Sequence, residues 1–380
     1  MLLPQTCIER ILMDKKLGVY LHIPFCRSKC PYCDFFSSRG SEAEYDSYTA
    51  ALTDRIKEWS DRIKRTADTV YFGGGTSSVL GTDRLCSVLD SVRGSFGVKD
   101  GAEITLEVNP ESGRSLDYSK LAAHGFNRLS IGLQSANENE LRQLGRLHRL
   151  DEVAQTVSMA QSSGINNISL DLMLGIPFQT KESLRRSIDY CASLDARHIS
   201  AYLLKIEEGT VFDRRRDKLI LPDDDAQSEL YLFAVDYMSS LGYEQYEISN
   251  FAKPGFESRH NTLYWRLDDY IGIGPSAHSF LDGKRFYYPR SMEEFLNGSV
   301  IDDGTGGDEK EFIMLSLRLK SGLDYSSYEN RFARPLPRRV LDSVERFTSL
   351  GYMESDGSHA SLTPKGFLIS NYIISELTEE

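Results

Sequence analysis

Short runs of β-branched, aromatic and aliphatic residues recur along the first half of the chain, and stretches with helical spacing separate them. The runs cover residues 18–23, 69–72, 103–108, 127–132, 168–173 and 198–204. Alternating strand and helix patterns are typical of a parallel sheet covered by helices, so the sequence predicts an α/β fold.

Several intervening stretches carry an apolar stripe that repeats every three or four positions. Such a stripe predicts a helix that packs one face on the sheet. A capping-box spacing between Asn137 and Glu140 predicts the start of another helix. The two clearest stripes consist of Tyr45, Tyr48, Leu52, Ile56, Trp59 and Ile63, and of Leu184, Ile188, Cys191 and Leu194.

Unusual polar residues and glycines follow every one of the six predicted strands. A barrel collects such residues at the carboxyl-terminal rim of its strands, whereas an open doubly wound sheet gathers them at one crevice. Six units instead of eight predict a partial (β/α)6 barrel over residues 1–215. The residues in question are, in strand order, the cysteines near residue 30, Gly73 to Thr76, Glu107 with Asn109, Gln134, Asp171 with Gly175 to Pro177, and Lys205.

The second half of the chain has a different pattern. Residues 216–300 contain one helical stripe, stopped by Gly242, and then an aromatic-rich, turn-rich stretch, so we expect an accessory region. Residues 302–307 are rich in Gly and Asp and predict a linker. Residues 301–380 are expected to form a small C-terminal domain of helices, a short hairpin and a final helix, similar to a winged helix. The helical stripe consists of Leu230, Ala234, Tyr237 and Leu241.

The formal charge of −12 argues against a protein that binds nucleic acid through its phosphates. The last stretch of the winged-helix-like domain argues against DNA binding as well, because it has one lysine, Lys365, against Asp356, Glu376, Glu379 and Glu380. The chain has no apolar run of the roughly 18 residues that a membrane-spanning helix needs, so we expect a protein that is not integral to the membrane. Glu9 and Arg10 interrupt the segment where a signal peptide would be apolar, which favours a cytoplasmic protein.

Three cysteines, Cys26, Cys30 and Cys33, lie within eight positions directly after the first strand, whereas Cys7, Cys86 and Cys191 are scattered. This pattern suits a metal site in a reducing compartment better than a disulfide framework. Three thiolates can hold a [4Fe–4S] cluster and leave one iron open for a further ligand. The amino and carboxylate groups of S-adenosylmethionine are such ligands, and an electron from the cluster can cleave the sulfonium bond.

Two simpler interpretations of the cysteine loop compete with a cluster. Structural zinc takes four ligands, usually from two paired units, and the sequence has no second pair. His22 would serve as a fourth ligand only if the first strand bent back. Three free buried thiols are the other alternative, although Arg27 and Lys29 are interleaved with them.

With this loop and its lead-in from Tyr20 to Phe25, the sequence resembles the radical S-adenosylmethionine superfamily over residues 18–375. Within it, the chain is similar to the branch of oxygen-independent coproporphyrinogen III oxidases (HemN) and HemW haem chaperones. The resemblance implies that Tyr20, Gly74, Gly75, Thr76 and Glu107 contact the S-adenosylmethionine on the cluster. It also implies that the adenine or a second S-adenosylmethionine position is lined by Tyr32, Gln134, Arg146, Asp171 and Lys205.

The chemistry of these residues agrees with the implied roles. Glycines let backbone groups approach a ligand closely, although a plain tight turn would also use them, and Ser77 stands where the family usually has proline. Glu107 can accept hydrogen bonds from a ribose or an ammonium group, or can cap the next helix. Arg146 can hold a carboxylate through two hydrogen bonds, and Asp171 interrupts an apolar strand and needs a partner.

Three features favour the chaperone over the oxidase. Phe35 stands where the oxidase has a further cysteine, and only 19 residues precede Tyr20, where the oxidase has a longer segment. The segment from His260 to Trp265 matches the HNxxYW motif associated with haem in HemW proteins. His260 could ligate haem iron and the rings of Tyr264 and Trp265 could cover the macrocycle, although ordinary packing would use the same residues.

We therefore expect a chaperone that carries haem as cargo to apo-haemoprotein acceptors, receives electrons from a donor and can form a homodimer. The pattern leaves open whether radical chemistry turns over, and hence whether the chain is an enzyme. Conversion of coproporphyrinogen III is the alternative function, and another radical reaction, such as methyl transfer, is a third.

Overall fold

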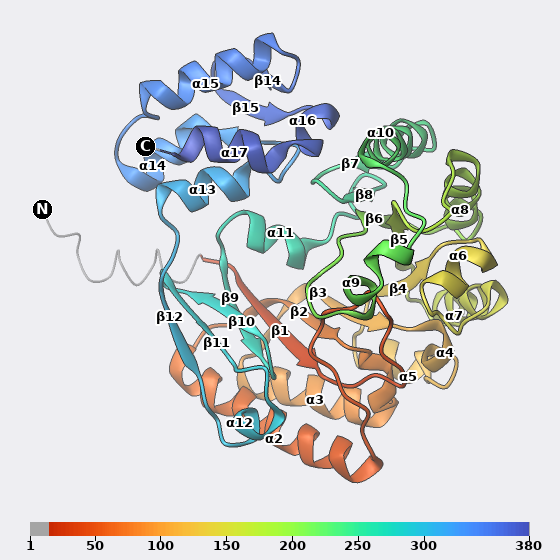
Figure 1. The fold of residues 1–380 in the computed structure, drawn as a ribbon. Helices are drawn as coiled ribbons and strands as arrows, with labels where there is room; N and C mark the ends of the chain where they lie inside the picture. Colours follow the sequence, from red (N-terminus) through yellow and green to blue (C-terminus); the bar gives the residue numbers. More distant parts are fainter. Residues whose placement is uncertain (1–14, 380) are drawn as a thin grey trace, which may run out of the picture.

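The computed structural model describes residues 15–379. Its core is a curved sheet in which the first six strands lie side by side in chain order and parallel to one another (Figure 1). All six runs expected from the sequence are strands. Their bounds are β1 (Leu17–Ile23), β2 (Ala67–Gly74), β3 (Val98–Val108), β4 (Arg128–Gln134), β5 (Asn167–Leu174) and β6 (His198–Leu203).

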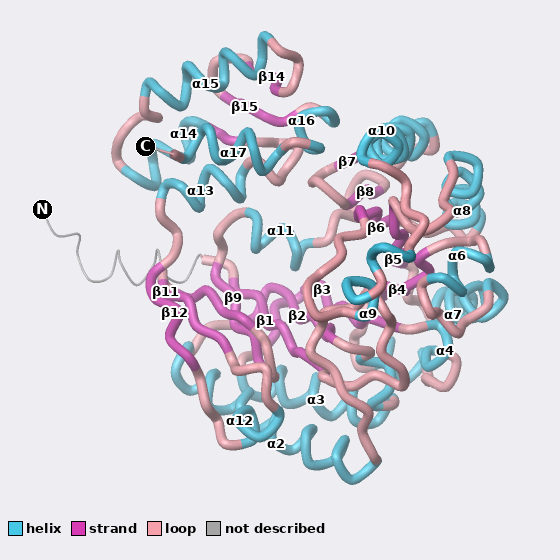
Figure 2. Tube along the Cα trace, viewed as in Figure 1, coloured by secondary structure: helices cyan, strands magenta, loops and turns pink. Residues whose placement is uncertain are grey.

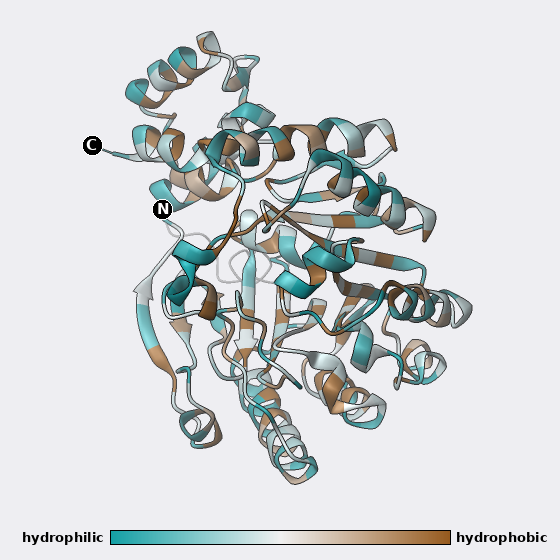
Figure 3. Ribbon diagram, turned by 45° about the vertical axis from the view of Figure 1, so that its right-hand side comes forward, coloured by the Kyte–Doolittle hydropathy of each residue, from teal (hydrophilic) through white to brown (hydrophobic). Residues whose placement is uncertain are grey.

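Helices connect these strands and cover one face of the sheet (Figure 2). The apolar stripe expected in α2 is buried from Tyr45 to Ile56, and Leu184, Ile188 and Cys191 of α8 are buried as well. Figure 3 shows apolar segments along the strands and alternating apolar and polar bands on the helices. The connecting helices are α2 (Glu42–Ile63), α3 (Thr82–Ser95), α4 (Pro110–Gly113), α5 (Tyr118–Ala123), α6 (Glu138–Gln143), α7 (Leu150–Ser162) and α8 (Lys181–Ser193), with a 3-10 turn at Ser77–Leu80.

Two local predictions about helix starts and linkers were wrong in detail. Helix α6 begins where expected, but Glu140 does not form a capping box with Asn137, because its carboxylate accepts a hydrogen bond from Ser135. A capping box instead opens α2, between Ser41 and Glu44. The stretch expected to be a linker, residues 302–307, is largely strand β12, because it pairs with β11.

Residues 216–300, together with β12 of the expected C-terminal domain, extend the same sheet at both edges. Strand β9 lies parallel to β1 and carries β10, β11 and β12 beyond it, while β8 and β7 lie antiparallel beyond β6. The sheet ends at β12 and β7, so these strands do not close it into a full barrel. The added strands are β7 (Glu244–Gln245), β8 (Asn250–Ala252), β9 (Asp269–Ile273), β10 (His278–Leu281), β11 (Lys284–Tyr287) and β12 (Ile301–Thr305).

The helices of this second half lie around the sheet. Helix α11 lies at the amino-terminal ends of β1 and β2, between the sheet and the C-terminal domain (Figure 1). The helices are α9 (Val211–Arg214), α10 (Asp224–Ser240), α11 (Arg259–Trp265) and α12 (Met292–Leu296), with a 3-10 turn at Arg216–Lys218.

The C-terminal domain consists of helices and a three-stranded sheet of order β13-β15-β14. The expected hairpin is β14 and β15, and the expected final helix is α17. The elements are α13 (Glu309–Ser316), β13 (Leu323–Asp324), α14 (Tyr325–Phe332), α15 (Arg338–Ser349), β14 (Met353–Ser355), β15 (His359–Leu362), α16 (Pro364–Leu368) and α17 (Ser370–Thr378). Within residues 15–379, no helix is long and apolar enough to span a membrane.

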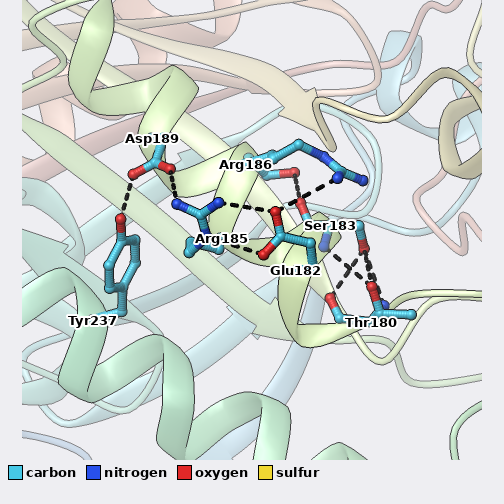
Figure 4. Close-up of polar contacts among 8 residues, drawn as sticks. Thr180, Glu182, Ser183, Arg185, Arg186, Asp189 and Tyr237 are labelled. Atoms are coloured by element: carbon cyan, nitrogen blue, oxygen red, sulfur yellow. Dashed lines mark hydrogen bonds and ion pairs between the residues drawn. The ribbon is translucent and has the colours of Figure 1, made fainter.

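A group of polar contacts fastens α8 to α10 on the outer surface (Figure 4). Arg185 binds the carboxylates of Glu182 and Asp189, and the Tyr237 hydroxyl donates a 2.5 Å hydrogen bond to Asp189. Exposed ion pairs of this kind contribute little to stability. This group therefore belongs to the scaffold and lies away from the cavity described next.

Candidate functional site

A cavity of about 380 Å³ lies inside the curve of the sheet and opens at the carboxyl-terminal ends of the strands. Its volume falls in the range of about 300–1,000 Å³ that is usual for small-molecule sites. The structure brings together on its wall eleven of the fourteen residues that the sequence singled out. These are Cys26, Cys30, Cys33, Tyr32, Gly74, Gly75, Thr76, Glu107, Gln134, Arg146 and Asp171.

The cysteine loop is held in place by its own backbone and by neighbouring strands. The Cys26 amide donates a 2.9 Å hydrogen bond to the Ser38 carbonyl, and its thiol lies 3.3 Å from the Thr76 hydroxyl. The Cys30 sulfur accepts a long contact, 3.7 Å, from Arg146. Burial raises the pKa of the Cys33 thiol in the absence of a metal. All three cysteines line the cavity, as ligands of a shared cluster would need to.

The candidate fourth zinc ligand near this loop is engaged by other groups. Residues 15–379 contain no group of three or more His, Cys, Asp or Glu side chains arranged around one ion position. His22, the candidate fourth zinc ligand, has both ring nitrogens occupied: one lies 3.0 Å from the Tyr20 hydroxyl and the other 3.1 Å from the Phe36 carbonyl. The donor set of three separate thiols facing one cavity therefore fits an iron–sulfur cluster better than zinc.

The glycine turn after β2 packs directly against the cysteine loop. Gly74 has a φ of +114°, which strongly favours glycine. A Cβ atom on Gly75 would lie 2.6 Å from the Phe25 carbonyl oxygen and 3.0 Å from the Cys26 sulfur. The Gly74 amide donates to Glu107 and the Gly75 amide to the Ile23 carbonyl, so the turn is fixed tightly beside the thiols.

Two acidic side chains face the cavity from β3 and β5. The Glu107 carboxylate accepts hydrogen bonds from the Tyr71 hydroxyl at 2.8 Å and from the Gly74 amide at 3.2 Å. Burial raises the pKa of Glu107 from 4.5 to about 7, and the nearby Asp171 adds to the shift. Asp171 accepts a 3.0 Å hydrogen bond from Ser130, and burial raises its pKa to about 6. Both groups can accept hydrogen bonds from an ammonium or a ribose.

Arg146 reaches into the cavity from the loop after α6. Its guanidinium donates to the Asn109 side chain at 3.1 Å and to the Gly132 carbonyl at 3.2 Å, while its Nε is buried without a partner. Gln134, at the end of β4, has a φ of +69° and accepts a 3.0 Å hydrogen bond from the Tyr202 hydroxyl. The unused Nε of Arg146 is a buried donor that a ligand carboxylate can satisfy.

The structure places three of the predicted residues outside the cavity wall. Tyr20 lies beside it, and its ring contacts Tyr71 and His22. The Lys205 side chain is 79 % exposed and pairs with Glu207, so it lies outside the cavity wall. His260 is 1 % exposed, and its ring nitrogens lie 2.7 Å from the Thr69 and Tyr264 hydroxyls. In this structure His260 holds α11 on the sheet through these contacts, and its role as an iron ligand stays a prediction.

Sequence reasoning missed several residues of the wall, notably Arg128 on β4 and Asn261 on α11. A signal for Arg128 was present, because residues 128, 130, 132 and 134 alternate along one strand and so share a face. Asn261 belongs to the HNxxYW motif, but the motif does not indicate that this residue reaches the cavity, since α11 is distant in sequence and folds under the sheet.

Comparisons with known proteins agree with this arrangement. The Radical SAM superfamily matches residues 20–191, and the HemN C-terminal domain matches residues 310–369. In solved structures, the coproporphyrinogen III oxidase (HemN) of Escherichia coli has the same fold, with a TM-score of 0.82 and 21 % identity over 99 % of this chain and 94 % of that one. The fold and the cysteine-lined cavity define a radical S-adenosylmethionine protein.

Curated relatives narrow the assignment. The heme chaperone HemW of Escherichia coli K12 is 35 % identical over 94 % of this chain and 97 % of its own length. Heme chaperones HemW of Mycobacterium tuberculosis H37Rv and Bacillus subtilis 168 are 33 % and 32 % identical over similar shares, 95 % and 94 % of this chain and 94 % and 97 % of their own. The chain belongs to the HemW family.

Proposed function

We propose that this protein is a haem chaperone that binds haem and delivers it to apo-haemoproteins. The observation that carries the proposal is the full-length similarity to heme chaperones HemW, which includes both the barrel and the C-terminal domain. Phe35, 63 % exposed beside the cysteine loop, supports it further, because the oxidase branch has a cysteine there. Coproporphyrinogen oxidation is the less favoured alternative.

The haem seat that we propose is a cleft of about 640 Å³ between the end of α11 and the C-terminal domain. Trp265 and Phe312 give it aromatic surface, and the indole N–H of Trp265 is buried without a partner. The exposed guanidinium groups of Arg266 and Arg331 line the same cleft. Flat apolar rings suit the macrocycle, and guanidinium groups suit the two propionates of haem.

The cavity in the barrel is the proposed site of a [4Fe–4S] cluster and of S-adenosylmethionine. Cys26, Cys30 and Cys33 would hold the cluster, and the turn from Gly74 to Thr76 would hold the methionine end with its backbone groups. Glu107 would accept hydrogen bonds from the ligand, and Tyr32, Gln134, Arg146 and Asp171 would line the rest. When bound, the cluster supplies an electron for cleavage of the sulfonium bond.

The proposal implies further partners. An electron donor would have to reach the cluster, and apo-haemoproteins would accept the cargo. A cytoplasmic location is part of the same proposal, supported by the reduced thiols that the cysteine loop requires. A homodimer is proposed as well.

The test is a parallel assay of one anaerobically reconstituted preparation. Haem titration should give a saturable Soret shift, weakened at least about tenfold in Trp265→Ala/Phe312→Ala, because much of the apolar contact is lost. His260→Ala should bind haem with a smaller loss than this double variant. The same preparation should not convert coproporphyrinogen III to protoporphyrinogen IX. Efficient conversion without haem binding would contradict the proposal and favour the oxidase.

A further inference from the structure

Arg128 is a fully buried arginine whose guanidinium has no protein partner. The residue is 1 % exposed, and its Nε is buried without a hydrogen bond. Among residues 15–379, its side chain forms neither a hydrogen bond nor an ion pair, although it lines the cavity. A buried charge without hydrogen bonds lowers the stability of the folded protein by several kcal/mol, so we expect a ligand that pairs with this charge.

Arg128 lies at the closed end of the cavity, away from the cysteines. It is the first residue of β4, and Ser130, Gly132 and Gln134 follow on the same wall up to the open rim. At about 3.3 Å per residue, the six steps from Arg128 to Gln134 span roughly 20 Å. A ligand at Arg128 would therefore lie deeper than one held by the cysteine loop and the glycine turn.

The two acidic groups of the cavity do not neutralise Arg128 directly. Glu107 is bonded to Tyr71 and Gly74, and Asp171 to Ser130. Neither carboxylate lies within ion-pair distance of Arg128 among the described contacts, although the positive charge of Arg128 lowers the pKa of both. Their negative charge disfavours a dianion such as phosphate at this place and leaves a monoanion as the better match.

Further donors converge on the same end. Asn261 and Ser249 also line the cavity, and neither side chain forms a hydrogen bond in the described part of the chain. Asn261 belongs to α11, Ser249 to the turn before β8, and Arg128 to β4. Three separate elements therefore bring residues with unused donors to the same cavity. Arg128 can offer two parallel N–H groups to a carboxylate, and Asn261 can add a third.

We propose that Arg128 and Asn261 bind a carboxylate at the closed end of the barrel cavity, as a second ligand site below the S-adenosylmethionine position. The carboxylate belongs either to a small free acid or to the acid arm of a larger molecule that enters from the rim. The site does not depend on the proposed haem function, because the haem cleft lies on the other side of α11.

The test is calorimetric titration of the anaerobically reconstituted protein at constant ionic strength. One arm uses sodium propionate, a second uses coproporphyrin III as a carrier of propionate arms, and sodium chloride is the blank. Wild-type protein should bind propionate with a Kd on the order of 1 mM. Arg128→Met and Asn261→Leu should weaken this at least about tenfold, and Arg128→Lys less, since lysine keeps the charge but loses the paired donors.

Arg142→Met is the matched control, because Arg142 is an exposed arginine on α6 and should leave binding unchanged. Cluster absorbance and circular dichroism establish that each variant is folded; if Arg128→Met does not fold, Arg128→Lys and Asn261→Leu decide. If only coproporphyrin III binds in an Arg128-dependent way, the natural carboxylate is the acid arm of a larger molecule. If propionate binds in an Arg128-dependent way, it is a small free acid. Binding of neither probe, or equal binding by the variants and wild type, overturns the proposal.

Discussion

Nε2 of His260 lies 2.7 Å from the hydroxyl oxygen of Tyr264, one helical turn away on α11. Nδ1 of the same ring lies 2.7 Å from the Thr69 hydroxyl on β2, and the ring stacks on Tyr71 with centroids 5.0 Å apart. Tyr71 in turn donates to Glu107 in the cavity wall. The histidine and tyrosine of the motif are therefore partners of each other, and they fasten α11 beneath the cavity.

His260→Ala should lower the free energy of unfolding by about 2–4 kcal/mol, because it leaves the buried Thr69 and Tyr264 hydroxyls unpaired and opens a gap under Tyr71. Urea unfolding measures this. His278→Ala, at an exposed histidine, should stay within about 0.5 kcal/mol of wild type. Equal effects of the two substitutions would show that His260 does not hold α11 in this way.

Gly75→Ala should reduce iron incorporation strongly, because the new Cβ would collide with the Phe25 carbonyl and crowd the Cys26 sulfur. Gly94→Ala is the matched control: a Cβ there meets nothing within 4 Å, and alanine favours the helix α3. Iron and sulfide analysis after reconstitution checks both variants. Full cluster content in Gly75→Ala would refute the close packing of turn and loop.

Alanine at Cys26, Cys30 or Cys33 should abolish the air-sensitive absorption of about four irons and four sulfides per chain. Alanine at the buried Cys86 or Cys191 should leave it intact, since both pack in the hydrophobic core. Cys7 lies outside the described residues, and Cys7→Ala is also expected to keep the cluster. Iron-free protein that carries one zinc would contradict the cluster.

Glu107→Gln should stabilise the S-adenosylmethionine-free protein at pH 8 and have little effect at pH 4.5. Because the folded-state pKa of Glu107 is raised from 4.5 to about 7, the folded state holds its proton more tightly, and stability falls as the pH rises through this window. The cavity partly screens the charge, so the gain is on the order of 1 kcal/mol. Urea unfolding at both pH values, with the exposed Glu138→Gln as control, measures it. A Glu107→Gln variant that is less stable than wild type at pH 8 would contradict the raised pKa of Glu107.

The strands and much of the cavity could be predicted because their signals are local. Each of β1 to β6 contains a short run of β-branched, aromatic or aliphatic residues, and the residues at its end reach the rim whatever lies elsewhere in the chain. Lys205 also follows a strand, but the chain turns outward there and the side chain pairs with Glu207 in solvent. Position after a strand therefore does not by itself bring a long side chain into the cavity.

Long-range pairing explains what the sequence could not predict. Strand β9 (Asp269–Ile273) pairs in parallel with β1, some 250 residues earlier, and this pairing places α11 under the barrel. The same packing buries His260 and places Asn261 in the cavity wall, and the motif alone indicates neither. Such contacts depend on tertiary packing, which leaves no periodic signal in the chain.

The most direct test of the proposed chaperone function is haem transfer. Reconstituted protein loaded with one equivalent of haem is mixed with apomyoglobin, and the appearance of the myoglobin Soret spectrum is followed over time. We predict that haem reaches apomyoglobin faster from this protein than from serum albumin. In the Trp265→Ala/Phe312→Ala variant, the amount of haem loaded and the amount transferred should fall together. A protein that binds no haem, or that retains all of it in the presence of excess apomyoglobin, would contradict the proposed function.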